Sequence, residues 1–292
     1  MSNATAVTDN LGINFGFCTA PHIENYLTDI LRSDSEKENV IASLVIFGSA
    51  AVGGYARQIS DVDLLLVIRD GSTEKTRSNI QNLVSELEKR HGIAKPQDYS
   101  RSTLERLVAR LTANVRSFFV CTHADLLSGD PGRILGISEA QAKFVDRTAV
   151  ASIITSGITV YGENLLAQVP LSPIRRLDVG KAFFGLFNQL LLIIAFYPVL
   201  SMGTKYAMDT LKRSVHNCYF CYHLRLRLLT EEVAFFQKRY GVSIPLTQLL
   251  SLRSEYHPSI RFVISCIPAM MQLHLHTIRD NRFPRYIPVD IK

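Results

Sequence analysis

The segment of the chain with the clearest potential for chemistry is FGSAAVGGYARQISDVDLLLVI, at positions 47–68. Asp61 and Asp63 precede an apolar run, and side chains two residues apart on a strand project from the same face. Two neighbouring carboxylates repel each other unless a cation lies between them. Oxygen ligands of this kind suit Mg²⁺, which commonly uses one or two carboxylates together with substrate phosphates. The sequence therefore predicts a magnesium site at Asp61 and Asp63.

A second feature of the same segment is suited to phosphate. Gly48 and Ser49 follow an apolar run and precede small residues. Glycine lets the backbone approach a ligand closely, while serine offers a hydroxyl and a backbone N–H at the expected start of a helix. We therefore expect a site that holds a triphosphate, facing the site that holds the metal.

The elements that must position these residues follow from the hydrophobic patterning. Apolar residues at helical spacing predict helices at 21–34, 73–91 and 102–111. Short apolar runs predict strands at 41–48, from 61 to a turn at 70–71, and at 117–122. Residues 138–168 are expected to be helical apart from a turn around 157–162. Residues 178–279 are expected to form helices with loops near 198–204, 241–245 and 257–258.

Two prolines in the segment QVPLSP, at 168–173, interrupt the pattern and mark the expected domain boundary. We expect an α/β (α+β) domain with a mixed sheet at 20–168. An all-helical domain is expected at 174–280.

The motif resembles that of a known family. Its order is strand, Gly-Ser, spacer, Ser-Asp-x-Asp and apolar strand, here Gly48, Ser49, Ser60, Asp61 and Asp63. This order resembles the DNA polymerase β-like nucleotidyltransferase superfamily. The resemblance implies that the Gly-Ser pair and Ser60 bind the nucleotide, and that the two aspartates bind two divalent metals. It also implies transfer of a nucleoside monophosphate with release of pyrophosphate.

Two further features fit the same resemblance. The segment ITVYGENLL, at 158–166, is similar to the ending that many stand-alone members show after their catalytic domain. A helical second half is common in the antibiotic-modifying members, where it completes the substrate cleft. The resemblance thus implies a catalytic domain at 20–168 and a substrate-binding domain at 174–280.

A third acidic residue on a later strand is also implied, since in this family it completes one metal site and activates the attacking hydroxyl. Asp125, which follows the strand expected at 117–122, is the first candidate, and Asp98 is the second. Neither lies inside an apolar strand as the family pattern has it, so a site with two acids stays an alternative. For Asp125, a loop residue or a helix cap is the other interpretation.

The helical half carries a polar stripe within 204–228. At about 100° per residue, one face of this helix collects polar and charged side chains. They are Lys205, Asp209, Lys212, His216, Tyr219, His223 and Arg227. We expect Lys205 and Lys212 to face the cleft and bind the phosphates or an anionic acceptor. A solvated face without function is the alternative.

The segment HNCYFCYH, at 216–223, contains residue types that bind zinc. On a helix its two histidines share one face and its two cysteines lie nearly opposite, so the four cannot surround one tetrahedral ion. We expect the cysteines to be core residues.

Composition excludes several classes of protein. The 292 residues are 47% hydrophobic and 20% charged, which indicates a globular chain of about two domains and excludes a disordered one. The net charge of +6 suits an anionic ligand. The odd number of scattered cysteines favours a reducing cytoplasm, and the N-terminal residues lack a secretory signal pattern. Asn188, Gln189 and Pro198 interrupt the apolar stretch at 183–202, so we expect a core helix and no membrane partner.

The sequence therefore predicts a cytoplasmic nucleotidyltransferase that uses Mg²⁺, with two ions, and an NTP, with ATP preferred. Its acceptor is expected to be a hydroxyl of a small molecule, a protein or an RNA. The alternative is a nucleotide-binding regulatory or antitoxin-like protein with little or no turnover. RNA end addition is favoured only if the basic stripe and the C-terminal arginines, Arg279, Arg282 and Arg285, form one surface.

Overall fold

The computed structural model of the chain describes residues 13–14, 20–55, 62–93, 117–137, 147–200, 202–241 and 244–287. Several positions singled out above lie outside these ranges. They are Ser60, Asp61, Asp98 and the helix expected at 102–111.

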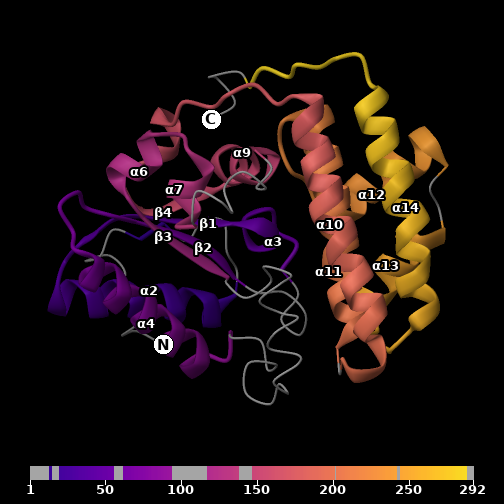
Figure 1. Cartoon of the computed structure of the whole chain (residues 1–292). Helices are drawn as coiled ribbons and strands as arrows, with labels where there is room; N and C mark the ends of the chain where they lie inside the picture. Colours follow the sequence, from indigo (N-terminus) through magenta and orange to yellow (C-terminus); the bar gives the residue numbers. More distant parts are fainter. Residues whose placement is uncertain are drawn as a thin grey trace.

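A four-stranded mixed sheet forms the centre of the first half (Figure 1). In chain order its strands are β1 (Ile41–Phe47), β2 (Asp63–Ile68), β3 (Phe118–Thr122) and β4 (Ile158–Gly162). They lie in the order β3-β2-β1-β4. β1 runs antiparallel to both β2 and β4, and β2 runs parallel to β3. The mixed sheet expected from the sequence is confirmed.

β4 corrects the turn expected around 157–162. Its residues pair with β1, with Tyr161 opposite Leu44 and Thr159 opposite Val45. The segment ITVY is rich in β-branched and aromatic residues, which fit a pleated surface. The expected helix therefore ends at Ser156, the last residue of α9 (Arg147–Ser156), and a short 3₁₀ helix, η2 (Leu165–Gln168), follows the strand.

Helices cover both faces of the sheet (Figure 1). One face carries α2 (Pro21–Lys37) and α4 (Glu74–Arg90), and the other carries α6 (His123–Leu127), α7 (Pro131–Leu135) and α9. Side chains alternate along β2, so that Leu64 and Leu66 pack in the first layer while Leu65 and Val67 pack in the second. The same alternation places Asp63 on the face that α9 covers.

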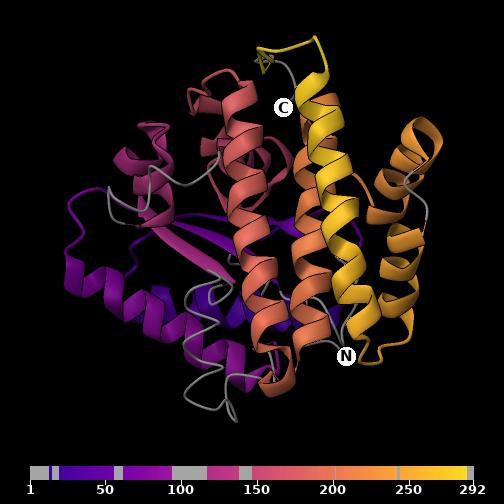
Figure 2. The same ribbon diagram turned by 45° about the vertical axis from the view of Figure 1, so that its right-hand side comes forward.

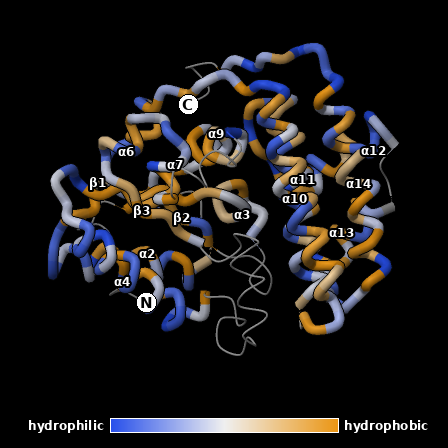
Figure 3. The backbone as a smooth tube through the Cα atoms, in the orientation of Figure 1, coloured by the Kyte–Doolittle hydropathy of each residue, from blue (hydrophilic) through white to orange (hydrophobic). Residues whose placement is uncertain are grey.

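The second half is helical, as expected. It consists of α10 (Arg176–Phe196), the 3₁₀ turn η3 (Tyr197–Val199), α11 (Gly203–His223), α12 (Leu229–Tyr240), α13 (Ile244–Ser254) and α14 (Ile260–Arg279). Figure 2 shows α10, α11 and α14 as long neighbouring helices. The continuous apolar core of this half includes Leu190, Leu211, Phe236 and Met270. Figure 3 shows continuous hydrophobic segments along the strands of the sheet, whereas the helices alternate in hydropathy.

The helix expected over 204–228 ends earlier than the pattern indicated. Leu224 adopts a left-handed conformation with φ +55°, and its N–H donates to the carbonyl of Phe220. Leu226 and Arg227 therefore lie in a connection to α12 and not on the face of α11. No glycine or proline marks this end, so the sequence carried no signal for it.

One helix of the described residues is long and apolar enough to cross a membrane. It is the stretch Arg176–Val199, which contains an 18-residue window with a mean hydropathy of 1.8, and 28% of that window is buried. Its inner side, including Leu186, Leu190 and Ile193, packs in the core of the helical half. By length and composition alone, a core helix of a soluble protein passes the same test.

The two halves touch at both ends of the helical half. α9 packs against α10 and α11, and Ala151 of α9 lies in one apolar cluster with Phe220. Ile174, just before α10, forms a two-way backbone bridge with Arg285, just after α14, with N···O distances of 3.0 and 2.9 Å. The Arg285 guanidinium also donates to the carbonyl of Tyr222 at 2.7 Å.

Candidate active site

The register of β1 against β2 brings two of the predicted site residues together. Phe47, the last residue of β1, lies opposite Asp63, the first residue of β2. Gly48 follows directly with φ +66°, and a Cβ atom at this position would overlap with Oδ2 of Asp63. The carboxylate therefore lies against the backbone of Gly48, where only glycine leaves room for it.

Ser49 adds a buried hydroxyl at the same place. Its side chain is 6% exposed, and its Oγ is a buried atom to which the described residues give no hydrogen-bond partner. An unsatisfied buried hydroxyl costs about 1–3 kcal/mol, so a ligand that bonds to it is favoured. Ser49 lies in α3 (Gly48–Ala51), which is a single turn. We therefore assign its suitability for phosphate to the hydroxyl and the open glycine and not to a helix dipole.

The donor set fits a divalent cation in part. The described residues contain no group of three or more His, Cys, Asp or Glu side chains that could hold a metal ion by themselves. An ion at Asp63 would therefore need further oxygen ligands. Asp61, outside the described residues, and the phosphates of a nucleotide are chemically suited to supply them, as is usual for Mg²⁺.

The residue that precedes β3, and that lies next to Asp63 in the register, is a serine. Leu64 pairs with Phe118, and the N–H of Leu64 donates to the carbonyl of Ser117 at 2.8 Å. Ser117 thus lies beside Asp63 in the register of the parallel pair, and its hydroxyl donates to the Glu88 carboxylate. The position of Ser117 next to Asp63 was not predicted from the sequence, because the register of β3 depends on pairing between strands that no local pattern indicates.

Asp125 lies at the opposite end of the sheet. It follows β3, whose last residue, Thr122, pairs with Ile68 at the far end of β2 from Asp63. Five residues of strand separate the two ends, or about 17 Å. Its backbone N–H and carboxylate form a capping box with Thr122, and its carboxylate lies 3.6 Å from the Arg77 guanidinium. The structure thus shows a helix cap and does not bring Asp125 together with Asp63.

The two lysines predicted to bind phosphate differ in their surroundings. Lys205 is buried in the first turn of α11, where the neighbouring Thr204 accepts from the N–H of Ser259 at 2.8 Å. Lys212 is half-buried two turns further on. Lys205 is 6% exposed as a residue, and Lys212 is the more exposed of the two, so we give Lys212 the role of phosphate contact.

The end of α11 and the start of α12 border the candidate site. The Leu228 side chain lies 3.5 Å from the position of a Cβ atom on Gly54, and the Gly54 N–H donates to the carbonyl of Ser49 at 2.8 Å. The N–H of Leu226 donates to the Ser156 hydroxyl at 3.1 Å. In Figure 1, α10 and α11 are the helices of the second half that face the sheet and α3.

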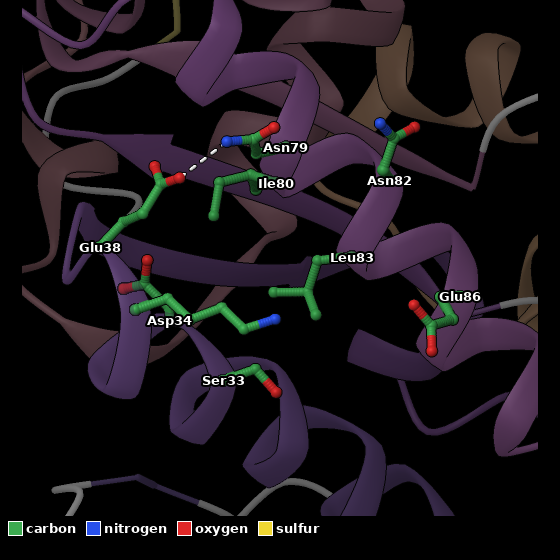
Figure 4. A pocket seen from close by; sticks show the side chains of 9 residues that line it. Ser33, Asp34, Glu38, Asn79, Ile80, Asn82, Leu83 and Glu86 are labelled. Carbon is green, nitrogen blue, oxygen red and sulfur yellow. Dashed lines mark hydrogen bonds between the residues drawn. The ribbon is translucent and has the colours of Figure 1, made fainter.

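A pocket of about 280 Å³ lies between α2 and α4, away from these residues (Figure 4). Three of its polar side chains are engaged within the fold. The Asn79 amide donates to Glu38, and the Asp34 carboxylate accepts from the N–H groups of Val40 and Ile41. The pocket is on the face of the sheet opposite to Asp63, so we assign it no part in the site.

The residues of the rejected zinc interpretation are placed as expected. Cys218 and Cys221 are buried in the apolar clusters around α11. His216 instead bonds to Glu232, a residue that the sequence pattern did not single out. Nothing in the sequence linked the two, because they meet through the packing of separate helices.

The class of protein follows from this geometry and from comparison with known folds. A mixed sheet that holds a Gly-Ser turn against an aspartate, followed by a helical region, is a nucleotidyltransferase fold. Residues 27–113, which include Gly48, Ser49 and Asp63, match the nucleotidyltransferase domain family. This segment of the chain is thus similar to nucleotidyltransferase domains, and the fold around it is that of a nucleotidyltransferase.

The solved structures that the chain resembles include spectinomycin adenyltransferase AAD(9) from Enterococcus faecialis, crystallised with ATP and spectinomycin. The sequences are 11% identical, and the TM-score is 0.50. The similarity covers 87% of this chain and 98% of that one. At this identity the likeness shows the fold. No curated protein matches the sequence.

Proposed function

We propose that the protein transfers AMP from ATP to a hydroxyl of a small molecule, with release of pyrophosphate, in a reaction that requires Mg²⁺. One observation carries this proposal. The Asp63 carboxylate lies against the backbone of Gly48 and beside the buried Ser49 hydroxyl, within a segment that matches the nucleotidyltransferase family.

Each residue has a distinct role in the proposed reaction. Asp63, together with Asp61, would hold the divalent ions, which neutralise charge on the transferred phosphoryl group. The absence of a side chain at Gly48 leaves room for the Asp63 carboxylate, which would meet the metal-bound phosphates. The Ser49 hydroxyl would donate to one of them, and Lys212 would offset their negative charge.

The nature of the substrates is supported by the fold neighbour. That protein was crystallised with ATP and with spectinomycin, a small molecule. The net charge of +6 is in keeping with an anionic substrate such as ATP. We place the reaction in the cytoplasm, which supplies MgATP.

An RNA acceptor is less well supported. It would require a continuous surface of the α11 stripe and the C-terminal arginines. Lys205 is buried, Arg282 pairs with Asp280 at 2.8 Å, and the Arg285 guanidinium donates to the carbonyl of Tyr222. These side chains are committed to the fold, so a small-molecule acceptor is preferred.

The test is an assay with ATP labelled at the α-phosphate, Mg²⁺ and a panel of hydroxyl acceptors that includes spectinomycin and other aminocyclitols. We expect a labelled acceptor and an equal amount of pyrophosphate, both absent in Asp63→Asn. If calorimetry detects no binding of MgATP and no acceptor is labelled, the proposal is overturned.

A second candidate function is favoured because the described residues bring no third acid to Asp63: its neighbour before β3 is Ser117, and Asp125 lies at the far end of β2. It is a nucleotide-binding regulatory protein with little or no turnover. This candidate predicts that MgATP binds normally and that no member of the panel releases pyrophosphate.

A further inference from the structure

A row of polar side chains on α11 is set apart from the rest of this helix. Most residues of α11 are buried, including Leu211, Val215 and Cys218. Five polar residues that recur at helical spacing are half-buried instead. They are Asp209, Lys212, Arg213, His216 and Asn217. α11 packs against α9, α10, α12, α13 and α14, and His216 places part of this row at the contact with α12.

One member of the row is held by a fully buried carboxylate. Glu232, on α12, is 0% exposed, and its Oε2 lies 2.5 Å from Nδ1 of His216. Its Oε1 accepts from the N–H of Arg227 at 3.0 Å. Burying a carboxylate is costly unless its oxygens are bonded, and here both of them are. The hydrogen bond from the Arg227 N–H fixes the orientation of the Glu232 carboxylate, and the carboxylate in turn fixes the orientation of the His216 ring.

This arrangement determines which ring nitrogen remains available. The Glu232 carboxylate can only accept a hydrogen bond, so Nδ1 of His216 carries the hydrogen and donates it. In the neutral ring, Nε2 then has the free lone pair. Within the described residues no hydrogen bond engages Nε2, and it is not among the buried atoms that lack a partner. The His216 side chain is 16% exposed. Nε2 is therefore an accessible proton acceptor.

A continuous series of contacts connects this pair to the nucleotide site. Glu232 bonds to Arg227, and the next residue, Leu228, packs against Gly54. Gly54 in turn donates to the carbonyl of Ser49. The His216–Glu232 pair thus lies at the border between the helical half and the segment that carries Gly48 and Ser49.

We propose that His216 is the general base for the acceptor hydroxyl and that Glu232 is its positioning residue. The inference rests on the proposed function. The hydroxyl gives its proton to Nε2 while its oxygen forms a bond to the α-phosphorus of ATP. The bond from that phosphorus to the oxygen bridging to the β-phosphorus breaks, and pyrophosphate leaves. The Glu232 carboxylate stabilises the imidazolium, which then gives its proton to solvent.

The proposal gives the reaction a base where the described strands bring none to Asp63. Ser117, beside Asp63, cannot act as a carboxylate base, and Asp125 lies at the other end of the sheet. A base on the helical half would reach an acceptor bound between the halves. The acceptor would then be a neutral polyol, because the same row of α11 carries Asp209 as well as the cations Lys212 and Arg213.

The charged groups around the ring determine its response to pH. Besides Glu232 they are Lys212 and Arg213 on the same helix and the ion pair between Arg227 and Glu231, whose side chains are 3.7 Å apart. Only the neutral ring can accept a proton from the acceptor.

The test uses the full chain and compares His216→Ala with the wild type in the transfer assay. We expect kcat to fall by about 10²–10⁴-fold, with unchanged affinity for MgATP, because general-base catalysis contributes this much. Added imidazole should restore part of the rate. In Glu232→Gln, kcat should fall less and the acidic limb of the pH profile should shift.

The matched control is His276→Ala, which removes a half-buried histidine that stacks on Tyr240 with a ring separation of 4.2 Å. It should leave kcat and the acidic limb unchanged. The proposal is overturned if His216→Ala keeps the wild-type kcat. It is also overturned if the variant loses kcat together with thermal stability and added imidazole restores none of the rate. If the wild type itself transfers no AMP to any acceptor, the proposed function fails first, and the base assignment fails with it.

Discussion

The carboxylate of Asp63 occupies the space that a side chain on Gly48 would need. The two residues are neighbours because β1 ends at Phe47 opposite the first residue of β2. The antiparallel register thus builds the site from the ends of two strands. An acid and an open stretch of backbone face each other there, and a cation with its phosphates needs both.

Gly48→Ala should abolish the site. The left-handed φ of +66° costs a non-glycine residue about 1–2 kcal/mol, and the new methyl group would displace the Asp63 carboxylate. We expect MgATP binding, measured by calorimetry, to be lost. Gly53→Ala is the matched control, because Gly53 has φ +76° with nothing within 4 Å of its Cβ position. It should show the same backbone cost in urea unfolding and retain binding. Equal binding by the two variants would contradict the role of this contact.

Asp63→Asn keeps the shape of the side chain and removes its charge. A metal ion stabilises the charge of the transition state by several kcal/mol in such reactions, so the rate of AMP transfer should fall by at least about 100-fold. Circular dichroism should show an intact fold. Asp34→Asn, on the opposite face of the sheet, should keep the rate of AMP transfer and lower the free energy of unfolding. The reason is that the Asp34 carboxylate accepts hydrogen bonds from two backbone N–H groups and stabilises the fold. Retained transfer in Asp63→Asn would remove Asp63 from the metal site.

Asp125→Asn should leave transfer unchanged. The residue caps α6 together with Thr122 and pairs with Arg77, so the expected loss is about 1 kcal/mol of unfolding free energy. Chemical denaturation and the transfer assay measure the two effects separately. A variant that folds normally and transfers no AMP would restore Asp125 as the third acid.

His274 should make the stability of the protein depend on pH. Its side chain is 1% exposed, and this burial lowers the pKa of His274 from 6.5 to about 4. The unfolded chain therefore binds a proton between these values that the folded chain does not. The unfolding free energy should fall by on the order of 3 kcal/mol as the pH falls from 6.5 to 4.

His274→Gln tests this dependence, since its amide can still bond to the Val179 carbonyl that now lies 3.3 Å from Nδ1 of His274. Urea unfolding at pH 7 and pH 4.5 should show a smaller difference in the variant than in the wild type. Parallel pH dependence in the two proteins would mean that another group is responsible.

The parts of the fold that the sequence predicted are those with local signals. The apolar runs of β1 and β2 and the helical spacing in α2 and α4 lie within single segments, and the structure confirms them. The Gly-Ser pair and Asp63 were predictable for the same reason. Each lies at the end of a strand whose pattern is clear, so their meeting required only that the two strands pair.

The parts that the sequence could not predict depend on contacts between distant segments. β4 is a short strand that forms because β1 offers an edge, and Leu224 ends α11 without a glycine. The register of β3 determines that Asp125 lies far from Asp63. The bond between His216 and Glu232 arises from the packing of α12 on α11, and neither residue is unusual by itself.

The backbone bridge between Ile174 and Arg285 closes the helical half into a loop of chain whose entrance and exit are fastened together. The carboxyl-terminal segment also lies at the junction of the two halves, since Phe283 packs against the cluster that contains Ala151 and Phe220. Cleavage after Arg279 would release this segment from its covalent link to α14. The packing of α9 on α10 and α11 would then remain to hold the two halves together.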